Sequence, residues 1–179
     1  KLEIIEEKIE DADCAQAFIS GLLHASGTIT RNNEAMFVDI VTDFKEIFDF
    51  LNLLVEHLYG EKLSLEISDD HIINKTTYYR LRFPQKISTQ VLKDTSLLSS
   101  SGEFNLGGEI DPNIIADEST KIAFLKGAYV GCATSSIKLS ELGSRNPTTG
   151  YHVEFASHRE SFLEGISTVL KDFIITSRI

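Results

Sequence analysis

The sequence repeats one pattern, AFISGLLHASG at residues 17–27 and AFLKGAYVGCA at residues 123–133. Small residues stand four positions apart in both copies, namely Gly21 with Ala25 and Gly127 with Gly131. A glycine inside a helix costs roughly 1 kcal/mol relative to alanine, so its presence in both copies indicates that two helix backbones approach closely. We therefore predict that the two copies form helices that pack against each other.

The repeat continues beyond these two stretches. Residues 36–43, MFVDIVTD, align with residues 151–158, YHVEFASH, and an amphipathic run follows each segment, at 47–58 and at 162–170. The apolar residues of both runs have helical spacing. Each copy therefore reads as a helix, two strands and a second helix.

The first copy continues through two more strands and a closing helix. The expected elements are a helix at 14–26, strands at 28–31 and 35–42, a helix at 43–59, strands at 62–68 and 76–83, and a helix at 86–98. We expect an α+β fold made of a pseudo-two-fold pair of αββαββα halves. Residues 1–98 form the first half with an N-terminal helix, 99–116 a serine- and glycine-rich linker, and 117–179 the second half. That half is incomplete, since its last strand pair is mostly missing, and the chain is expected to be a fragment.

Composition is that of a folded domain with an acidic balance. The 179 residues are 42% hydrophobic and carry a formal net charge of −10. No apolar stretch approaches the ~18 to 20 residues that cross a bilayer. We therefore expect no membrane partner. Two cysteines, Cys14 and Cys132, are too few for a disulfide framework and lack the spacing of a zinc site, so we expect a cytoplasmic location.

Basic residues gather on the predicted strands. In the strand at 76–83, alternation places Tyr79, Leu81 and Phe83 toward the core, and leaves Tyr78, Arg80 and Arg82 on the opposite face. The same reasoning turns Leu63, Leu65 and Ile67 inward, and Thr28, Thr30, Asp39, Ser136, Lys138, His152 and Glu154 outward. The row of Tyr78, Arg80 and Arg82 is a plausible surface for contact with a phosphate backbone, although a merely solvated face fits this pattern equally well.

Two Gly-containing helices at matching places in an αββαββα repeat resemble the paired motifs of the LAGLIDADG homing endonucleases. The segments 14–27 and 123–132, followed by Asn146-Pro147 and by GYHVEF at 150–155, are similar to the N-terminal domain of the WhiA family of bacterial sporulation regulators. The similarity covers most of the chain and is strongest from about 117 to 157.

The resemblance makes the last residue of each motif helix informative. In active LAGLIDADG nucleases an acid stands there, and the two acids hold a divalent metal over the scissile phosphates. The matching positions here are Ser26 and Cys132. A hydroxyl and a thiol do not replace two carboxylates as ligands of magnesium, so we expect no metal, no cofactor and no cleavage.

The resemblance implies that the protein is a regulator that binds DNA. WhiA-like proteins bind double-stranded DNA mainly through a C-terminal helix-turn-helix domain, which is absent from this sequence. If the predicted sheet itself binds duplex DNA, the candidate contacts are Tyr78, Arg80, Arg82 and Lys138, with weak and salt-sensitive affinity. The family also implies a role in transcription regulation, sporulation, or cell division and chromosome segregation, with transcription-machinery proteins as partners and a nucleoid-associated, cytoplasmic location.

Two other functions remain open. One is an active homing endonuclease or maturase that uses displaced acids, Asp39 and Glu154, which occupy equivalent strand positions. The other is a protein-interaction scaffold whose DNA groove is idle. His24 stands where the motif often has its first aspartate, and a partly buried, hydrogen-bonded histidine is favoured there over a phosphate contact or a pH sensor.

Overall fold

The computed structural model describes residues 1–70, 76–136 and 152–179. Its helices are α1 (Leu2–Ile5), α2 (Ala12–Ser26), α3 (Lys45–Tyr59), α4 (Gln85–Asp94), α5 (Glu118–Cys132) and α6 (Glu160–Asp172). Its strands are β1 (Thr28–Asn32), β2 (Ala35–Thr42), β3 (Ser64–Asp70), β4 (Thr76–Arg82), β5 (Ala133–Ser136) and β6 (His152–Phe155). The order of elements therefore follows the predicted repeat.

The two repeated helices begin at side-chain caps. The Asp11 carboxylate accepts a hydrogen bond from the Cys14 backbone N–H at 2.9 Å, so α2 starts at Ala12, before the expected residue 14. Asp117 caps α5 in the same way and forms a capping box with Thr120. Equivalent caps give both helices the same starting point in the repeat.

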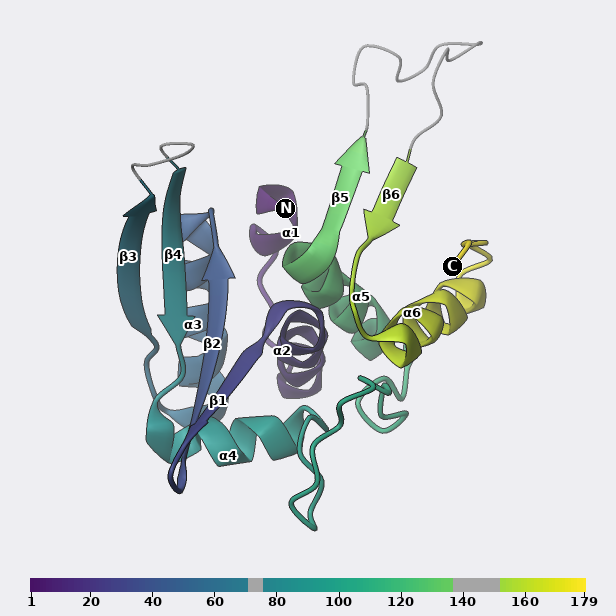
Figure 1. Ribbon diagram of the computed structural model, residues 1–179. Helices are drawn as coiled ribbons and strands as arrows, with labels where there is room; N and C mark the ends of the chain where they lie inside the picture. The colour runs from purple at the N-terminus through teal and green to yellow at the C-terminus, as the bar shows by residue number, and fades with distance from the viewer. Residues whose placement is uncertain (71–75, 137–151) are drawn as a thin grey trace.

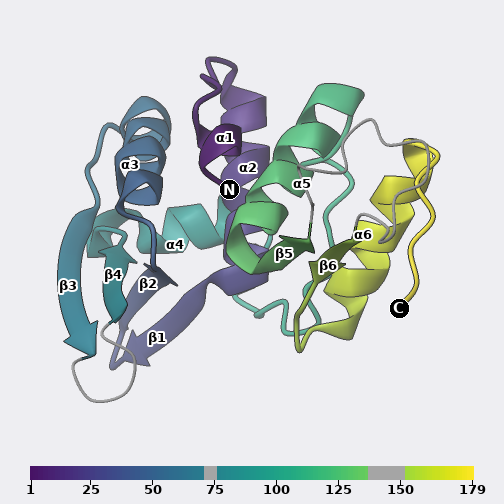
Figure 2. The same cartoon turned by 90° about the horizontal axis from the view of Figure 1, so that it is seen from above.

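Two antiparallel sheets flank the helix pair. The four-stranded sheet has the order β1-β2-β4-β3, and β5 pairs with β6 in a separate two-stranded sheet. Figures 1 and 2 show α2 between the larger sheet and α5, with α3 and α4 against one face of that sheet. No described helix covers the opposite face, which we call the open face. The open face consists of Thr28, Thr30, Phe37, Asp39, Val41, Ser64, Glu66, Ser68, Tyr78, Arg80 and Arg82, as register and alternation require.

The contact between α2 and α5 passes over two glycines. A methyl group added at Gly21 would overlap the Phe124 carbonyl oxygen, and one added at Gly127 would overlap the Phe18 carbonyl oxygen. These two contacts are equivalents in the repeat, because each glycine lies three residues after its copy's phenylalanine. The side chains of Phe18 and Phe124 are fully buried on either side of the seam. Backbone-to-backbone packing thus joins the halves about a pseudo-two-fold axis.

Two sequence expectations need correction. The helix expected at 86–98 ends at Asp94, because Ser96 adopts a left-handed backbone (φ 57°). Leu97 and Leu98 are nevertheless buried, so they continue the apolar pattern without continuing the helix. Ile67, expected inward, has 59% of its surface exposed, because it lies on an edge strand beyond the part of the sheet that the helices cover.

The segment between the halves is folded against the first half. The Asn105 side-chain oxygen accepts hydrogen bonds from the backbone N–H groups of Gly108 and Glu109, at 2.8 and 3.0 Å. The Asn105 amide donates in turn to the Ser96 and Glu109 carbonyls. This network holds Gly108 next to the end of α2, which brings the segment into the surroundings of the site.

Candidate nucleic-acid interface

The ends of the two central helices carry neutral side chains. The Ser26 hydroxyl donates a hydrogen bond to the Leu22 carbonyl oxygen at 3.1 Å, and both Ser26 and Cys132 are partly buried. Burial raises the pKa of the Cys132 thiol, which favours its uncharged form at neutral pH. Among the residues that the structure describes, no group of three His, Cys, Asp or Glu side chains is arranged to hold a metal ion.

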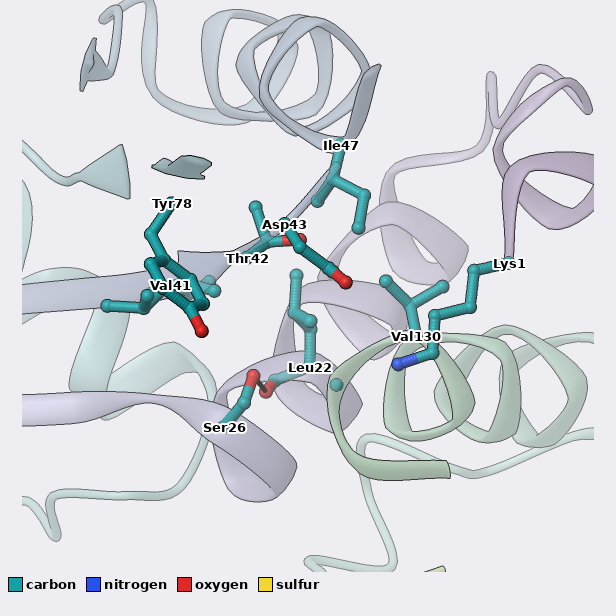
Figure 3. A pocket seen from close by; sticks show the side chains of 11 residues that line it. Lys1, Leu22, Ser26, Val41, Thr42, Asp43, Ile47, Tyr78 and Val130 are labelled. Carbon is teal, nitrogen blue, oxygen red and sulfur yellow. Dashed lines mark hydrogen bonds between the residues drawn. The ribbon is translucent and has the colours of Figure 1, made fainter. Parts of the chain in front are cut away.

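A cavity of about 190 Å³ lies where the helix ends meet the larger sheet (Figure 3). We call it the first-half pocket. Side chains from α2, β2, α3, β4 and α5 line it, and Figure 3 shows Lys1 and Asp43 reaching into it. The lining residues are Lys1, Leu22, Ser26, Ile40, Val41, Thr42, Asp43, Ile47, Tyr78, Val130 and Gly131. One basic and one acidic side chain therefore share the pocket.

The open face carries a compact ion-pair network centred on Asp39. Arg82 donates two hydrogen bonds to the Asp39 carboxylate, at 2.7 Å from Nε and 2.8 Å from the terminal nitrogen. Arg80 lies 3.7 Å from the same carboxylate and 3.8 Å from that of Glu66. The Asp39 side chain is only 3% exposed. Two cations thus face two anions, and these four side chains add no net charge to the face.

The geometry of Arg82 is fixed from two directions. Its guanidinium carbon lies 5.3 Å from the centre of the Phe37 ring, within the range of a cation–π contact. The hydrogen bonds to Asp39 raise the pKa of Arg82, which keeps the guanidinium charged. Arg82 is therefore a rigid member of the face, and its charge is already engaged.

The candidate DNA contacts do not all fall in the described part of the chain. Tyr78, Arg80 and Arg82 lie together on β4 and on the open face, as alternation predicted. Lys138 lies outside the described residues. Glu154 is exposed on β6, and Asp39 is buried in its ion-pair network on β2, so the two acids of the nuclease alternative lie on separate sheets.

His24 is a packing residue near the end of α2. It is 1% exposed, its Nε2 lies 2.8 Å from the Thr95 carbonyl oxygen, and its Nδ1 lies 3.3 Å from the Gly108 carbonyl oxygen. The rings of Phe124 and Phe162 lie at 6.0 and 6.1 Å. Burial lowers the pKa of His24 despite the two carbonyls. The prediction of a hydrogen-bonded histidine is confirmed, and its burial is complete rather than partial.

Sequence reasoning missed a second cavity beside the end of α2. It measures about 470 Å³, and we call it the second-half pocket. Its lining residues are His24, Ala25, Ser26, Gly27, Ala156, Ser157, His158, Arg159 and Leu163. The repeat itself contains a signal for it, because the alignment of 36–43 with 151–158 makes His158 the counterpart of Asp43 in the first-half pocket.

Comparison with known families gives two matches along this chain. Residues 12–98 match the WhiA N-terminal LAGLIDADG-like domain, and residues 123–179 match the WhiA LAGLIDADG-like domain. The "Probable cell division protein WhiA" of Shouchella clausii is 27% identical over 166 residues, which cover 92% of this chain and 48% of that protein. The chain thus spans about half the length of that curated relative.

Solved structures show the same fold. The crystal structure of the N-terminal LAGLIDADG domain of DUF199/WhiA superimposes with a TM-score of 0.64 and 17% identity, covering 99% of this chain and 74% of that one. The homing endonuclease I-DmoI, crystallised with its target DNA, gives a TM-score of 0.58 and 13% identity over 94% of this chain and 80% of that one. The predicted LAGLIDADG-like α+β fold is confirmed.

Proposed function

Because this chain belongs to the WhiA family, we propose that it is a catalytically silent LAGLIDADG-like part of a bacterial DNA-binding transcriptional regulator. The observation that carries the proposal is the pair of neutral residues, Ser26 and Cys132, at the ends of two helices that keep the nuclease-like packing. The proposed role is in sporulation, or in cell division and chromosome segregation, within the cytoplasm and at the nucleoid. No described helix is long and apolar enough to span a membrane.

Catalytic silence follows from ligand chemistry. Magnesium in a phosphodiesterase site is held by carboxylate oxygens, because a hard cation prefers hard anionic ligands. Ser26 and Cys132 offer a hydroxyl and a thiol that burial keeps protonated. Asp39, which the nuclease alternative requires, is already bound by Arg82 through both carboxylate oxygens. These features support a regulator over a homing endonuclease or maturase.

We propose that duplex DNA contacts the open face weakly, through Tyr78, Arg80, Arg82 and Lys138. The engagement of both arginines by Asp39 argues for low affinity, since an arginine must weaken one ion pair to form another. A helix-turn-helix domain outside these residues is proposed to supply the sequence-specific contact. I-DmoI, which shares the fold, is a protein that binds its target DNA.

A second candidate function is supported by the side chains at the centre of the open face. Val41 is 48% exposed and Tyr78 is 38% exposed, next to a net-neutral ion-pair network. Partly apolar surface with balanced charge suits a protein partner, including a transcription-machinery protein, better than it suits a phosphate backbone. The second candidate is therefore a protein-interaction scaffold.

Titration of a labelled duplex separates the two functions. We expect fluorescence anisotropy to show weak binding that falls roughly 40-fold between about 50 and about 200 mM salt, as phosphate contacts from Arg80, Arg82 and Lys138 require. Arg80→Ala combined with Arg82→Ala should abolish that binding, whereas Lys86→Ala, away from the open face, should leave it unchanged. Absence of binding at both salt concentrations would favour the scaffold.

Incubation of plasmid DNA with magnesium tests the remaining alternative. The proposal expects no nicking by the wild-type protein. Nicking that is lost on changing Asp39 and Glu154 to alanine would overturn catalytic silence.

A further inference from the structure

The second-half pocket is formed by two segments that are remote in sequence. The end of α2 contributes its residues 24–27, and the turn between β6 and α6 contributes residues 156–159, with Leu163 from α6. Its volume of about 470 Å³ is in the range of cavities that accept small ligands. Its polar lining consists of Ser26, Ser157, His24, His158 and Arg159, and none of the lining residues is acidic.

The two pockets are counterparts in the repeat and differ in charge. Each receives the turn after the second strand of one half and the end of the other half's central helix. Asp43 in the first-half pocket corresponds to His158 in the second, and the next residue changes from Phe44 to Arg159. The first-half pocket thus holds one acid, Asp43, together with Lys1, whereas the second-half pocket holds basic side chains and no acid.

Arg159 is held in place by groups that do not neutralise it. One terminal nitrogen donates to the His24 carbonyl oxygen at 3.1 Å, and the backbone N–H of Arg159 donates to the Ser157 hydroxyl at 3.2 Å. The arm of Arg159 lies over Gly108, where an added methyl group would come within 3.0 Å of its Cδ. These contacts fix the side chain, and none of them involves a carboxylate.

Arg159 differs from several other cations of the described chain in having no ion-pair partner. Six cations of the described chain have a carboxylate within 4.0 Å, namely Lys62, Arg80, Arg82, Lys86, Lys121 and Lys126. No such partner of Arg159 occurs in residues 1–70, 76–136 and 152–179, although Arg159 is half-buried. A partly desolvated guanidinium with free N–H donors is complementary to a planar or tetrahedral oxyanion.

We propose that the second-half pocket binds a phosphate group, which Arg159 contacts directly, with His158 and the hydroxyls of Ser26 and Ser157 as further hydrogen-bond partners. This inference goes beyond the proposed function, because it requires no duplex. The phosphate can belong to a free small molecule, such as a nucleoside monophosphate, or to a nucleic-acid backbone. Both sources present non-bridging phosphate oxygens as hydrogen-bond acceptors, and a comparison of probes distinguishes them.

Two-dimensional NMR of the labelled protein provides the test, with inorganic phosphate as the first probe at constant ionic strength. We expect saturable shifts of the backbone signals of Gly27 and Ser157–Glu160. Arg159→Gln should weaken binding at least about tenfold, because a charge-assisted hydrogen bond is lost. Lys171→Gln removes the same charge from an exposed position of α6 and should not change the affinity.

Two further variants keep the test independent of folding. Arg159→Lys retains the charge and should bind phosphate more tightly than Arg159→Gln. His158→Ala alters the pocket but leaves the hydrogen bond from Arg159 to the His24 carbonyl oxygen in place. Thermal denaturation verifies that each variant is folded. The proposal is wrong if the shifts are absent, lie outside the pocket, or persist unchanged in Arg159→Gln.

The source of the phosphate is found by comparing probes. A nucleoside monophosphate that binds more tightly than inorganic phosphate would identify a free small molecule as the occupant. A short duplex that displaces inorganic phosphate, while the monophosphate does not bind more tightly, would identify the nucleic-acid backbone. Phosphate binding with no duplex binding at all would leave this inference standing and contradict DNA contact by this domain.

Discussion

Asp39 on β2 and Arg82 on β4 lie directly opposite each other in the sheet and share two hydrogen bonds of 2.7 and 2.8 Å. The carboxylate is buried and the guanidinium is partly exposed. The pair therefore contributes to stability and at the same time limits what the open face can bind.

Replacing Asp39 by Asn should separate these two roles. We expect a loss of about 1–3 kcal/mol in the free energy of unfolding, because the charge-assisted hydrogen bonds of Arg82 are lost. Binding of duplex DNA should strengthen, since the face gains one net positive charge. Urea denaturation and anisotropy measure the two effects. Glu66→Gln, at an exposed position, should change stability by less than about 0.5 kcal/mol.

Substitution of Gly21 by Ala should destabilise the fold. Helix propensity alone would favour alanine by about 1 kcal/mol. The added methyl group would instead overlap the Phe124 carbonyl oxygen, so we expect a net loss of about 2 kcal/mol or more. Chemical denaturation checks the sign. Gly165→Ala in α6 is the matched control, because the atoms nearest to its methyl group belong to the Ile110 side chain and not to backbone. A similar loss in both variants would contradict the argument.

Stability should decrease on acidification because of His24. Burial depresses its pKa in the folded state, so the unfolded chain takes up a proton first as the pH falls below about 6.5. Linkage then lowers the free energy of unfolding from that pH down to the folded-state pKa. Urea denaturation at several pH values measures the slope. His24→Gln should have a smaller slope over this window, and an unchanged slope would exclude His24 as its cause.

Both thiols should react slowly with a disulfide reagent. Burial is the main cause that raises the pKa of Cys14 and of Cys132, and it also shields Cys132 sterically. At pH 8 we expect each thiol in the folded protein to react more slowly than in the urea-unfolded chain. Single Cys→Ser variants assign the two rates. A fast Cys132 would contradict its position as a partly buried residue at the helix end.

The spacing of residues along the sequence predicted helices and strands well where a single physical requirement determines which residues fit. The spacing of Gly21 and Ala25, and of Gly127 and Gly131, identified the helix pair because close backbone packing leaves few alternatives to small residues. The end of α4 was placed wrongly because Leu97 and Leu98 keep a helical spacing while the chain turns at Ser96. Burial alone does not distinguish a helix from a chain that folds back.

The site depended on long-range register that the sequence pattern does not contain. Alternation placed Asp39 and Arg82 on the same face, but their pairing joins residues 43 positions apart. The second-half pocket brings Ser26 and Gly27 beside Ser157–Arg159, and no local motif links these segments. Only the comparison of the two repeat copies could have drawn attention to His158.

Gly21 and Gly127 lie where the two halves pack together, and each half has its own sequence within the one chain. A homodimer would be obliged to carry the same residue at both symmetry-related positions, whereas this chain has Asp43 on one side and His158 on the other. The molecule therefore has a polarity although its scaffold is nearly symmetric. A partner that docks across the seam meets two unlike ends, so reversing its orientation changes the energy of the complex.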